Sequence, residues 1–195
     1  LDYAVAKGCV IAAAMGNDGA NLDDEAVYNY PSRYGKLIAV GAVDKNGKRA
    51  DFSNFGDYKQ VMAPGVGILS TYFGSRYEQL DGTSMATPFV AGLAALIKSV
   101  NPHLTPPEVI NLIRQTSSKS DQYGKEFGYG IIDALKAIKA VLGTEQRPIE
   151  EIPPFVQEVT RTLKSTGEEK VFRIVLSNQL VLDLDGPEGA DYDLY

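Results

Sequence analysis

The sequence predicts an α/β domain with a mostly parallel sheet flanked by helices, followed by a shorter segment of antiparallel strands. Over residues 1–143, continuous apolar runs of strand length alternate with helical segments. Residues 144–154 are rich in proline and glutamate, as a linker is. Within 155–195, the segments 170–176 and 180–184 alternate apolar and polar residues, which indicates antiparallel strands.

The strands of the first domain are predicted by their apolar residues. The runs 10–15 and 37–43 are continuously apolar, which is typical of strands buried on both faces. Shorter strands are expected over 60–63 and 67–71. Cys9 is the chain's one cysteine. It cannot form an internal disulfide, so we expect a buried small hydrophobe.

Four helices are predicted from apolar patterns and boundary residues. The segment 89–100 is apolar on almost every face, so we expect it to be fully buried. Thr105 and Glu108 have the spacing of a capping box, with proline at the first helical position, and begin the next helix. The other two helices cover 1–7 and 131–142, and a glycine follows each of them.

Composition limits the classes of partner. The chain has 195 residues, of which 44% are hydrophobic and 23% charged, as is ordinary for a globular protein. Its net charge is -6, and no basic stripe with interleaved aromatic residues occurs, so we expect no nucleic-acid partner. No apolar run approaches the roughly 20 residues of a bilayer span, so we expect no membrane partner.

Ser84 is the first candidate catalytic residue. It lies in Asp-Gly-Thr-Ser-Met-Ala-Thr-Pro (81–88), between a glycine-containing loop and the apolar helix. A helix N-terminus favours developing negative charge, which suits a nucleophilic serine. The alternative is an N-cap serine, the commonest role of serine before a helix. Ala86 stands where the nucleophile elbow of an α/β-hydrolase requires glycine, which disfavours that fold.

Asn17 is the second candidate. It follows the first buried strand in Met-Gly-Asn-Asp-Gly (15–19), where a side-chain amide can donate to an oxyanion. The alternative is an ordinary Gly-Asn turn.

These segments together resemble the subtilisin-like serine proteases (subtilases). Residues 81–92 are similar to the nucleophile motif of that family, although Phe89 stands where the family usually has histidine. Residues 12–17 are similar to its Ala-Ala-Ala-Gly-Asn segment, with Met15 inserted or substituted. Further similar segments are 29–34, 38–43, 52–56 and 62–68, so the resemblance covers residues 1 to 142. The closing Asp-Tyr-Asp-Leu-Tyr and the strands before it resemble the opening of a pre-peptidase C-terminal β-sandwich.

The resemblance implies hydrolysis of a polypeptide substrate through an acyl-enzyme on Ser84, outside the cell and with no cofactor for the chemistry. It also implies that Asn17 and the backbone N–H of Ser84 stabilise the oxyanion. The residues expected to border an uncharged pocket for the side chain that precedes the scissile bond are Ala14, Met15, Gly16 and Asn29.

The general base is the missing part. His103, the only histidine, follows Ser84 by 19 residues, and the helix between them carries the chain about 24 Å away. The family's order is Asp, His, Ser, so we expect the Asp and His on an N-terminal segment before Leu1. Because the chain opens inside a helix, we expect it to begin at a cut and to be nearly inactive alone. A bound propeptide is a further partner that the family implies.

The resemblance also implies a structural cation site for Ca²⁺ or Na⁺. Its ligands would be the backbone carbonyls of Ser32, Tyr34 and Leu37. The family often adds an aspartate where this chain has Gln60, which weakens the site. For the acidic run 23–25 we expect a solvated loop rather than a metal site.

Two other interpretations remain at this point. A subtilase scaffold used for binding without catalysis draws support from Phe89 and Met15, which depart from the family's motifs. An unrelated α/β binding domain requires the series of motifs to be a coincidence.

Overall fold

The computed structural model describes residues 1–24, 29–119, 121–143, 155–157, 173–176 and 180–183. The chain divides into two units, Leu1–Thr144 and Glu145–Tyr195. The first contains α1 (Asp2–Ala6), β1 (Ala12–Ala14), β2 (Ile38–Val43), β3 (Val61–Pro64), β4 (Ile68–Tyr72), β5 (Arg76–Leu80), α2 (Thr83–Val100), α3 (Pro106–Thr116) and α4 (Ala134–Leu142). The second contains β6 (Phe155–Gln157), β7 (Arg173–Leu176) and β8 (Leu180–Asp183).

A parallel sheet lies at the centre of the first unit. Its strand order is β1-β2-β3, and both pairings are parallel. The register places Ala13 opposite Ala39 and Val40 opposite Val61. The α/β class and the parallel sheet predicted from the sequence are therefore confirmed.

Side chains of β2 enter two apolar clusters, one on each face of the sheet. All six residues of β2 are buried. Ile38, Val40 and Ala42 belong to the main core, which also contains the buried face of α2. Ala39 belongs to a smaller cluster with Met15 and Leu22. Coverage of both faces explains why the sequence of this strand is continuously apolar.

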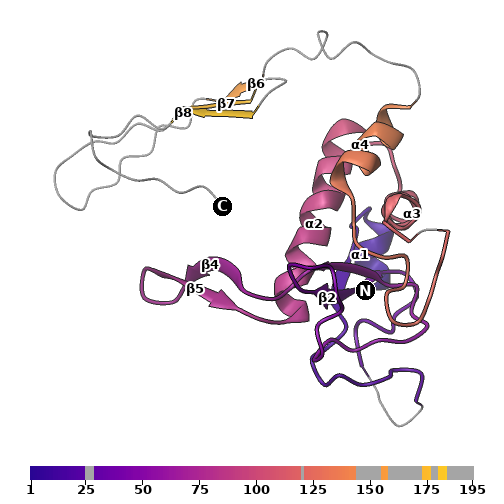
Figure 1. The fold of residues 1–195 in the computed structure, drawn as a ribbon. Coiled ribbons are helices and arrows are strands. Elements are labelled where there is room, and N and C mark those ends of the chain that lie inside the picture. Colours follow the sequence, from indigo (N-terminus) through magenta and orange to yellow (C-terminus); the bar gives the residue numbers. More distant parts are fainter. Residues whose placement is uncertain (25–28, 120, 144–154, 158–172, 177–179, 184–195) are drawn as a thin grey trace. The chain divides into compact units, whose positions relative to one another are not determined.

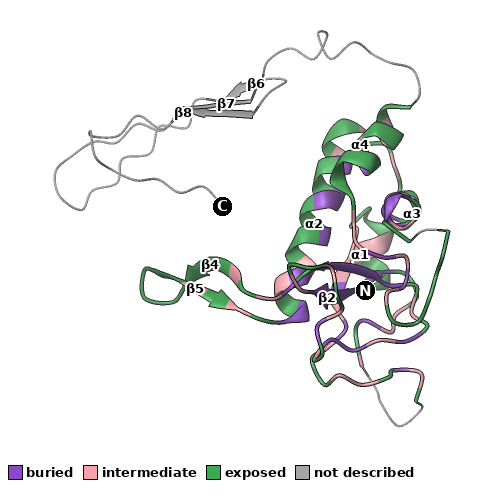
Figure 2. Ribbon diagram, in the orientation of Figure 1, coloured by how far each residue is buried: buried purple, intermediate pink, exposed green. Residues whose placement is uncertain are grey.

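The helix α2 packs along the sheet and contacts all three of its strands as well as α3 and α4 (Figure 1). Its buried residues recur three or four positions apart: Thr83, Ala86, Val90, Leu93, Ala94 and Ile97. The prediction of complete burial is wrong, because α2 has exposed residues along its length (Figure 2). Phe89 is 45% exposed and Leu96 is 46% exposed. They lie on the face of α2 that the sheet, α3 and α4 leave uncovered.

By length and composition, α2 with its 18 residues is able to cross a membrane. The expectation that no apolar run reaches this length therefore fails for this helix. Its contacts with all three strands are those of a core helix in a globular domain.

Two further details differ from the sequence prediction. Cys9 is exposed rather than buried, because it precedes β1, which lies at the edge of the sheet among the described residues. The helix α4 begins three residues later than expected. Ile131 forms a parallel bridge with Met62, and the carboxylate of Asp133 then caps the helix by accepting from the N–H of Lys136 at 2.8 Å.

A hairpin of β4 and β5 projects from the unit between the sheet and α2 (Figure 1). The two strands are antiparallel, with Ile68 opposite Leu80 and Tyr72 opposite Arg76. β4 agrees with the predicted strand 67–71. β5 was not predicted, because its residues are mostly polar and its side chains are largely exposed.

In the second unit, β6, β7 and β8 form an antiparallel sheet in that order. β7 and β8 lie within the two segments expected to be antiparallel strands. The expected linker 144–154 and the closing segment 191–195 lie outside the described residues, and the β-sandwich stays a prediction.

Candidate active site

Ser84 lies in the first turn of α2 and is exposed. Gly82 is the N-cap of this helix, with φ 154° and ψ 156°, and Thr83 is its first residue. The N-cap interpretation of Ser84 is therefore wrong, because another residue holds that position. As the second residue of the helix, Ser84 has a backbone N–H without an acceptor inside the helix.

A close backbone approach fixes the start of α2 against the sheet. The N–H of Gly82 donates to the carbonyl of Gly65, just after β3, at 2.8 Å. A Cβ on Gly65 would lie 2.6 Å from the Cβ of Ala42 and 2.8 Å from the carbonyl oxygen of Gly82. Only glycine allows this approach, which places Ser84 near the carboxyl ends of β2 and β3.

The side chain of Asn17 is attached to the same turn of α2. Its Oδ1 accepts from the backbone N–H of Thr83 at 2.9 Å and from the Thr83 hydroxyl at 2.8 Å. A backbone N–H can only donate, so the atom facing it must be the amide oxygen. The amide NH₂ is then directed away from Thr83, and Nδ2 lies 3.5 Å from the position of a Cβ on Gly82.

The side chain of Asn54, which is buried, holds the loop that carries Asn17. The Oδ1 of Asn54 accepts from the N–H groups of Asp18 and Ala20 at 3.0 and 2.9 Å. Its Nδ2 donates to the carbonyl of Met15 at 2.9 Å and to the Asp18 carboxylate at 3.1 Å. Asn54 has no local sequence signal for this role, because its partners lie 34 to 39 residues away in the chain.

This arrangement can bind an oxyanion. The N–H of Ser84 and the amide of Asn17 are donors of the kind that stabilise a tetrahedral intermediate. The N-terminus of α2 adds the positive end of the helix dipole.

Three of the four residues expected at the substrate pocket directly precede Asn17 in the chain, and the fourth, Asn29, follows it. The N–H of Gly16 donates to the Thr83 hydroxyl at 3.2 Å, and the Asn29 amide donates to the carbonyl of Met15. Ala14 ends β1 and is partly exposed. The side chain of Met15 is fully buried in the smaller apolar cluster, so only its backbone can border a pocket.

Gly16 has a positive φ of 94°. A Cβ at this position would lie 2.6 Å from the amide nitrogens of both Asn29 and Asn54. The Gly-Asn pair thus turns the chain immediately after β1. The interpretation as a turn and the interpretation of Asn17 as a side-chain donor are therefore compatible.

Comparison with known proteins identifies the family. The profile of the Subtilase family matches residues 1–130. The chain belongs to the subtilase family. It is similar to subtilisin DY from Bacillus licheniformis, with 47% identity over 130 residues that cover 67% of this chain and 46% of that protein. It is also similar to subtilisin BL from Lederbergia lenta, with 41% identity over 139 residues that cover 71% and 49%.

Solved structures agree with the subtilase assignment. A structure titled "Proteases from Pseudoalteromonas arctica PAMC 21717" matches with a TM-score of 0.64 and 38% identity, over 72% of this chain and 45% of that one. The subtilase chain therefore spans about half the length of the relatives it matches. The interpretation as an unrelated α/β binding domain is wrong.

In this subtilase chain, His103 is far from Ser84. It is exposed and follows the C-terminal end of α2, whereas Ser84 lies in the first turn. A helix of 18 residues is about 27 Å long. A general base must be within about 3 Å of the hydroxyl it deprotonates. The prediction that His103 cannot serve Ser84 is confirmed.

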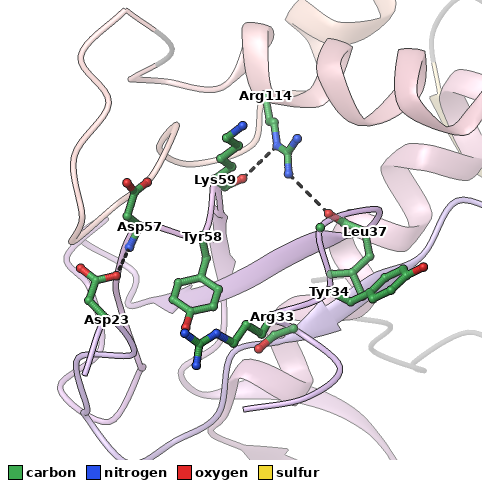
Figure 3. A pocket seen from close by; sticks show the side chains of 10 residues that line it. Asp23, Arg33, Tyr34, Leu37, Asp57, Tyr58, Lys59 and Arg114 are labelled. Carbon is green, nitrogen blue, oxygen red and sulfur yellow. Dashed lines mark hydrogen bonds between the residues drawn. The ribbon is translucent and has the colours of Figure 1, made fainter. Parts of the chain in front are cut away.

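The carbonyls expected to bind a cation border a pocket of about 410 Å³ (Figure 3). Ser32, Tyr34 and Leu37 are among the residues that line it. The carbonyl of Leu37, however, already accepts from the Arg114 guanidinium at 3.4 Å. The carbonyl of Tyr34 accepts from the N–H of Leu37 at 3.2 Å.

Asp23, at the rim of this pocket, has partners within the protein. Its carboxylate accepts from the N–H of Asp57 at 2.7 Å and pairs with Lys125 at 2.7 Å. These contacts, with the Asp57 N–H foremost, lower the pKa of Asp23. Within the described part of the chain, no three His, Cys, Asp or Glu side chains gather as a metal site would require. Glu25 of the acidic run lies outside the described residues.

Proposed function

We propose that this chain provides the nucleophile and the oxyanion donors of a serine endopeptidase. In the proposed reaction, Ser84 Oγ attacks the carbonyl carbon of the scissile peptide, and its proton passes to a histidine. That proton then goes to the leaving amine as the C–N bond breaks, and water later releases the acyl group from Ser84.

The observation that carries this proposal is the joint attachment of Asn17 and Ser84 to one turn of α2. The Thr83 N–H and hydroxyl hold the oxygen end of the Asn17 amide, which leaves the NH₂ end available as a donor. A preorganised donor needs no rearrangement when charge develops in the transition state.

We propose that the catalytic Asp and His come from an N-terminal segment of the same protease. The position of His103 and the roughly twofold greater length of the relatives support this proposal. The fragment alone is then nearly inactive, because a serine without a base is a weak nucleophile. We further propose that the protease acts on polypeptide substrates outside the cell and that a propeptide binds it. We also propose that residues 155–195 form part of a β-sandwich.

Covalent labelling of the complete protease tests the nucleophile. A fluorophosphonate probe is expected to label the full-length protein at Ser84, identified by peptide mapping. The Ser84→Ala variant and the present chain alone should remain unlabelled. A folded, complete protein that resists the probe would favour the non-catalytic scaffold, for which Phe89 in place of histidine is the main support.

The oxyanion role of Asn17 has its own test. Asn17→Asp keeps the oxygen that accepts from Thr83 but replaces the donating NH₂ by a second oxygen. The expected loss is about 10²–10³ in kcat with little change in KM, the value known from this kind of donor in subtilisin itself. Asn111→Asp, the same chemical change on the exposed face of α3, is the matched control. A loss confined to KM, or an equal loss in both variants, would contradict the role.

A further inference from the structure

The pocket in Figure 3 contains a guanidinium that contacts one of the three carbonyls expected to bind a metal ion, that of Leu37. Arg114 lies in the last turn of α3, and its guanidinium reaches toward the beginnings of β2 and β3. Its Nε donates to the carbonyl of Lys59 at 2.9 Å, and its Nη2 donates to the carbonyl of Leu37 at 3.4 Å. One cationic group therefore joins three segments through backbone oxygens, as a cation bound to loop carbonyls would.

Gln60 directly precedes β3, at the position where the family often adds an aspartate to such a site, and it offers no negative charge. Gln60 is fully buried and neutral, and both ends of its amide are in use. Its Oε1 accepts from the N–H of Tyr58 at 3.2 Å, and its Nε2 donates to the carbonyl of Lys125 at 2.7 Å. Calcium favours several oxygen ligands, including carboxylates, and Gln60 does not supply a carboxylate.

The two carboxylates that line the pocket are also engaged. Asp23 pairs with Lys125, and Asp57 accepts from the Tyr123 hydroxyl at 2.6 Å. To act as metal ligands, Asp23 would have to share its carboxylate with Lys125, and Asp57 would have to share its carboxylate with the Tyr123 hydroxyl.

The charge of Arg114 opposes a second cation at the same carbonyl. Burial lowers the pKa of its guanidinium, but an arginine stays protonated in a folded protein. Like charges at such short separation repel strongly, most of all where the protein excludes water.

We propose that the Arg114 guanidinium occupies the place of a structural cation, so that this carbonyl site of the protein takes neither Ca²⁺ nor Na⁺. The proposal concerns stability and cation binding alone, and it stands or falls separately from the catalytic role of Ser84.

The test uses the complete protease carrying Ser84→Ala, which prevents self-digestion. Arg114→Met removes the guanidinium while keeping a chain of similar length. Arg33→Met is the matched control, because Arg33 lines the same pocket but stacks over the Tyr58 ring at 5.9 Å. In choline chloride, Arg114→Met is expected to lower Tm by about 3–6 °C, and Arg33→Met by less than about 2 °C.

Cation binding is then measured in the same three proteins. Replacing choline by sodium or calcium chloride at equal ionic strength should raise Tm more in Arg114→Met than in the protein with Arg114. Crystals soaked in thallium(I), a probe for monovalent cations, should show no anomalous peak at the Leu37 carbonyl when Arg114 is present. A thallium peak there with Arg114 present, or a cation-specific rise in Tm that is equal or greater with Arg114, would overturn the proposal.

Discussion

Asn54 holds the loop that carries Asn17, and we expect it to influence the proposed chemistry through that loop. It makes four side-chain hydrogen bonds, all to the loop that carries Asn17. The Asn17 amide can therefore keep its direction only while the loop keeps its shape. Residues of this kind act on catalysis through geometry, since a donor displaced by about 1 Å can cost 10²-fold in rate.

Replacing Asn54 by Asp should disturb this geometry. The variant keeps an oxygen for the N–H groups of Asp18 and Ala20, but it loses the donor to Met15 and places two carboxylates together. We expect kcat of the complete protease to fall about 10-fold to 100-fold while KM stays nearly constant. The measurement is steady-state kinetics on a peptide substrate.

A rescue variant separates positioning from general damage. Adding Asp18→Asn to Asn54→Asp restores one donor and one acceptor between the two side chains, with their roles exchanged. Partial recovery of kcat supports the positioning role. A rise in KM without a fall in kcat, or no recovery in the double variant, would contradict it.

At the scale of elements, the start of α3 is fixed by a short-range motif. The backbone N–H and the hydroxyl of Thr105 both donate to the Glu108 carboxylate, each at 2.6 Å. These hydrogen bonds, with the hydroxyl foremost, lower the pKa of Glu108 below its ordinary value of 4.5. Because α3 carries Arg114, this cap also fixes the backbone position from which the Arg114 side chain extends.

A pH-dependent contribution to stability follows from the lowered pKa of Glu108. Its folded pKa lies below the unfolded one, so the contribution is complete above about pH 4.5 and is lost as pH falls through the folded pKa. The Tm difference between the parent protein and Glu108→Gln should therefore shrink as pH is lowered from about 7 to about 3. A difference that stays constant over this range, or that grows toward acid pH, would exclude the carboxylate as the stabilising form.

Local signals explain which elements were predicted from the sequence. The Thr105–Glu108 box and the continuously apolar run of β2 depend on neighbouring residues, so the prediction of both was confirmed. The exposed face of α2 could not be foreseen, because it depends on how much of the helix the rest of the fold covers. β5 was missed because an exposed, polar strand has little hydrophobic pattern.

The residues of the candidate site also divide into those with a local sequence signal and those without one. Ser84 and Asn17 were found because each lies in a local motif next to an apolar element. Asn54 and Arg114 were not, since their bonds join residues up to 39 and 77 positions apart. Long-range contacts of this kind leave no periodicity in the sequence.

At the scale of the whole molecule, the residues of the proposed site all belong to the first unit, 1–144. A complete protease that ends after Thr144 should therefore keep kcat/KM within about twofold of the untruncated enzyme. A twofold change corresponds to less than about 0.5 kcal/mol in the activation free energy. Initial rates on a short peptide substrate are the measurement. A large loss of kcat in a truncated protein with an unchanged Tm would show that the second unit takes part in the reaction.

The bond between Asn17 and Thr83 also bears on how the molecule folds. It links positions 66 residues apart, across the whole stretch that forms β2, β3 and the hairpin. Closing so long a loop costs conformational entropy before the contact at its ends can form. Contacts of high sequence separation therefore slow folding. The Asn17 amide therefore acquires its direction only when α2 docks on the sheet, and a growing or half-folded chain lacks the proposed oxyanion site until that moment.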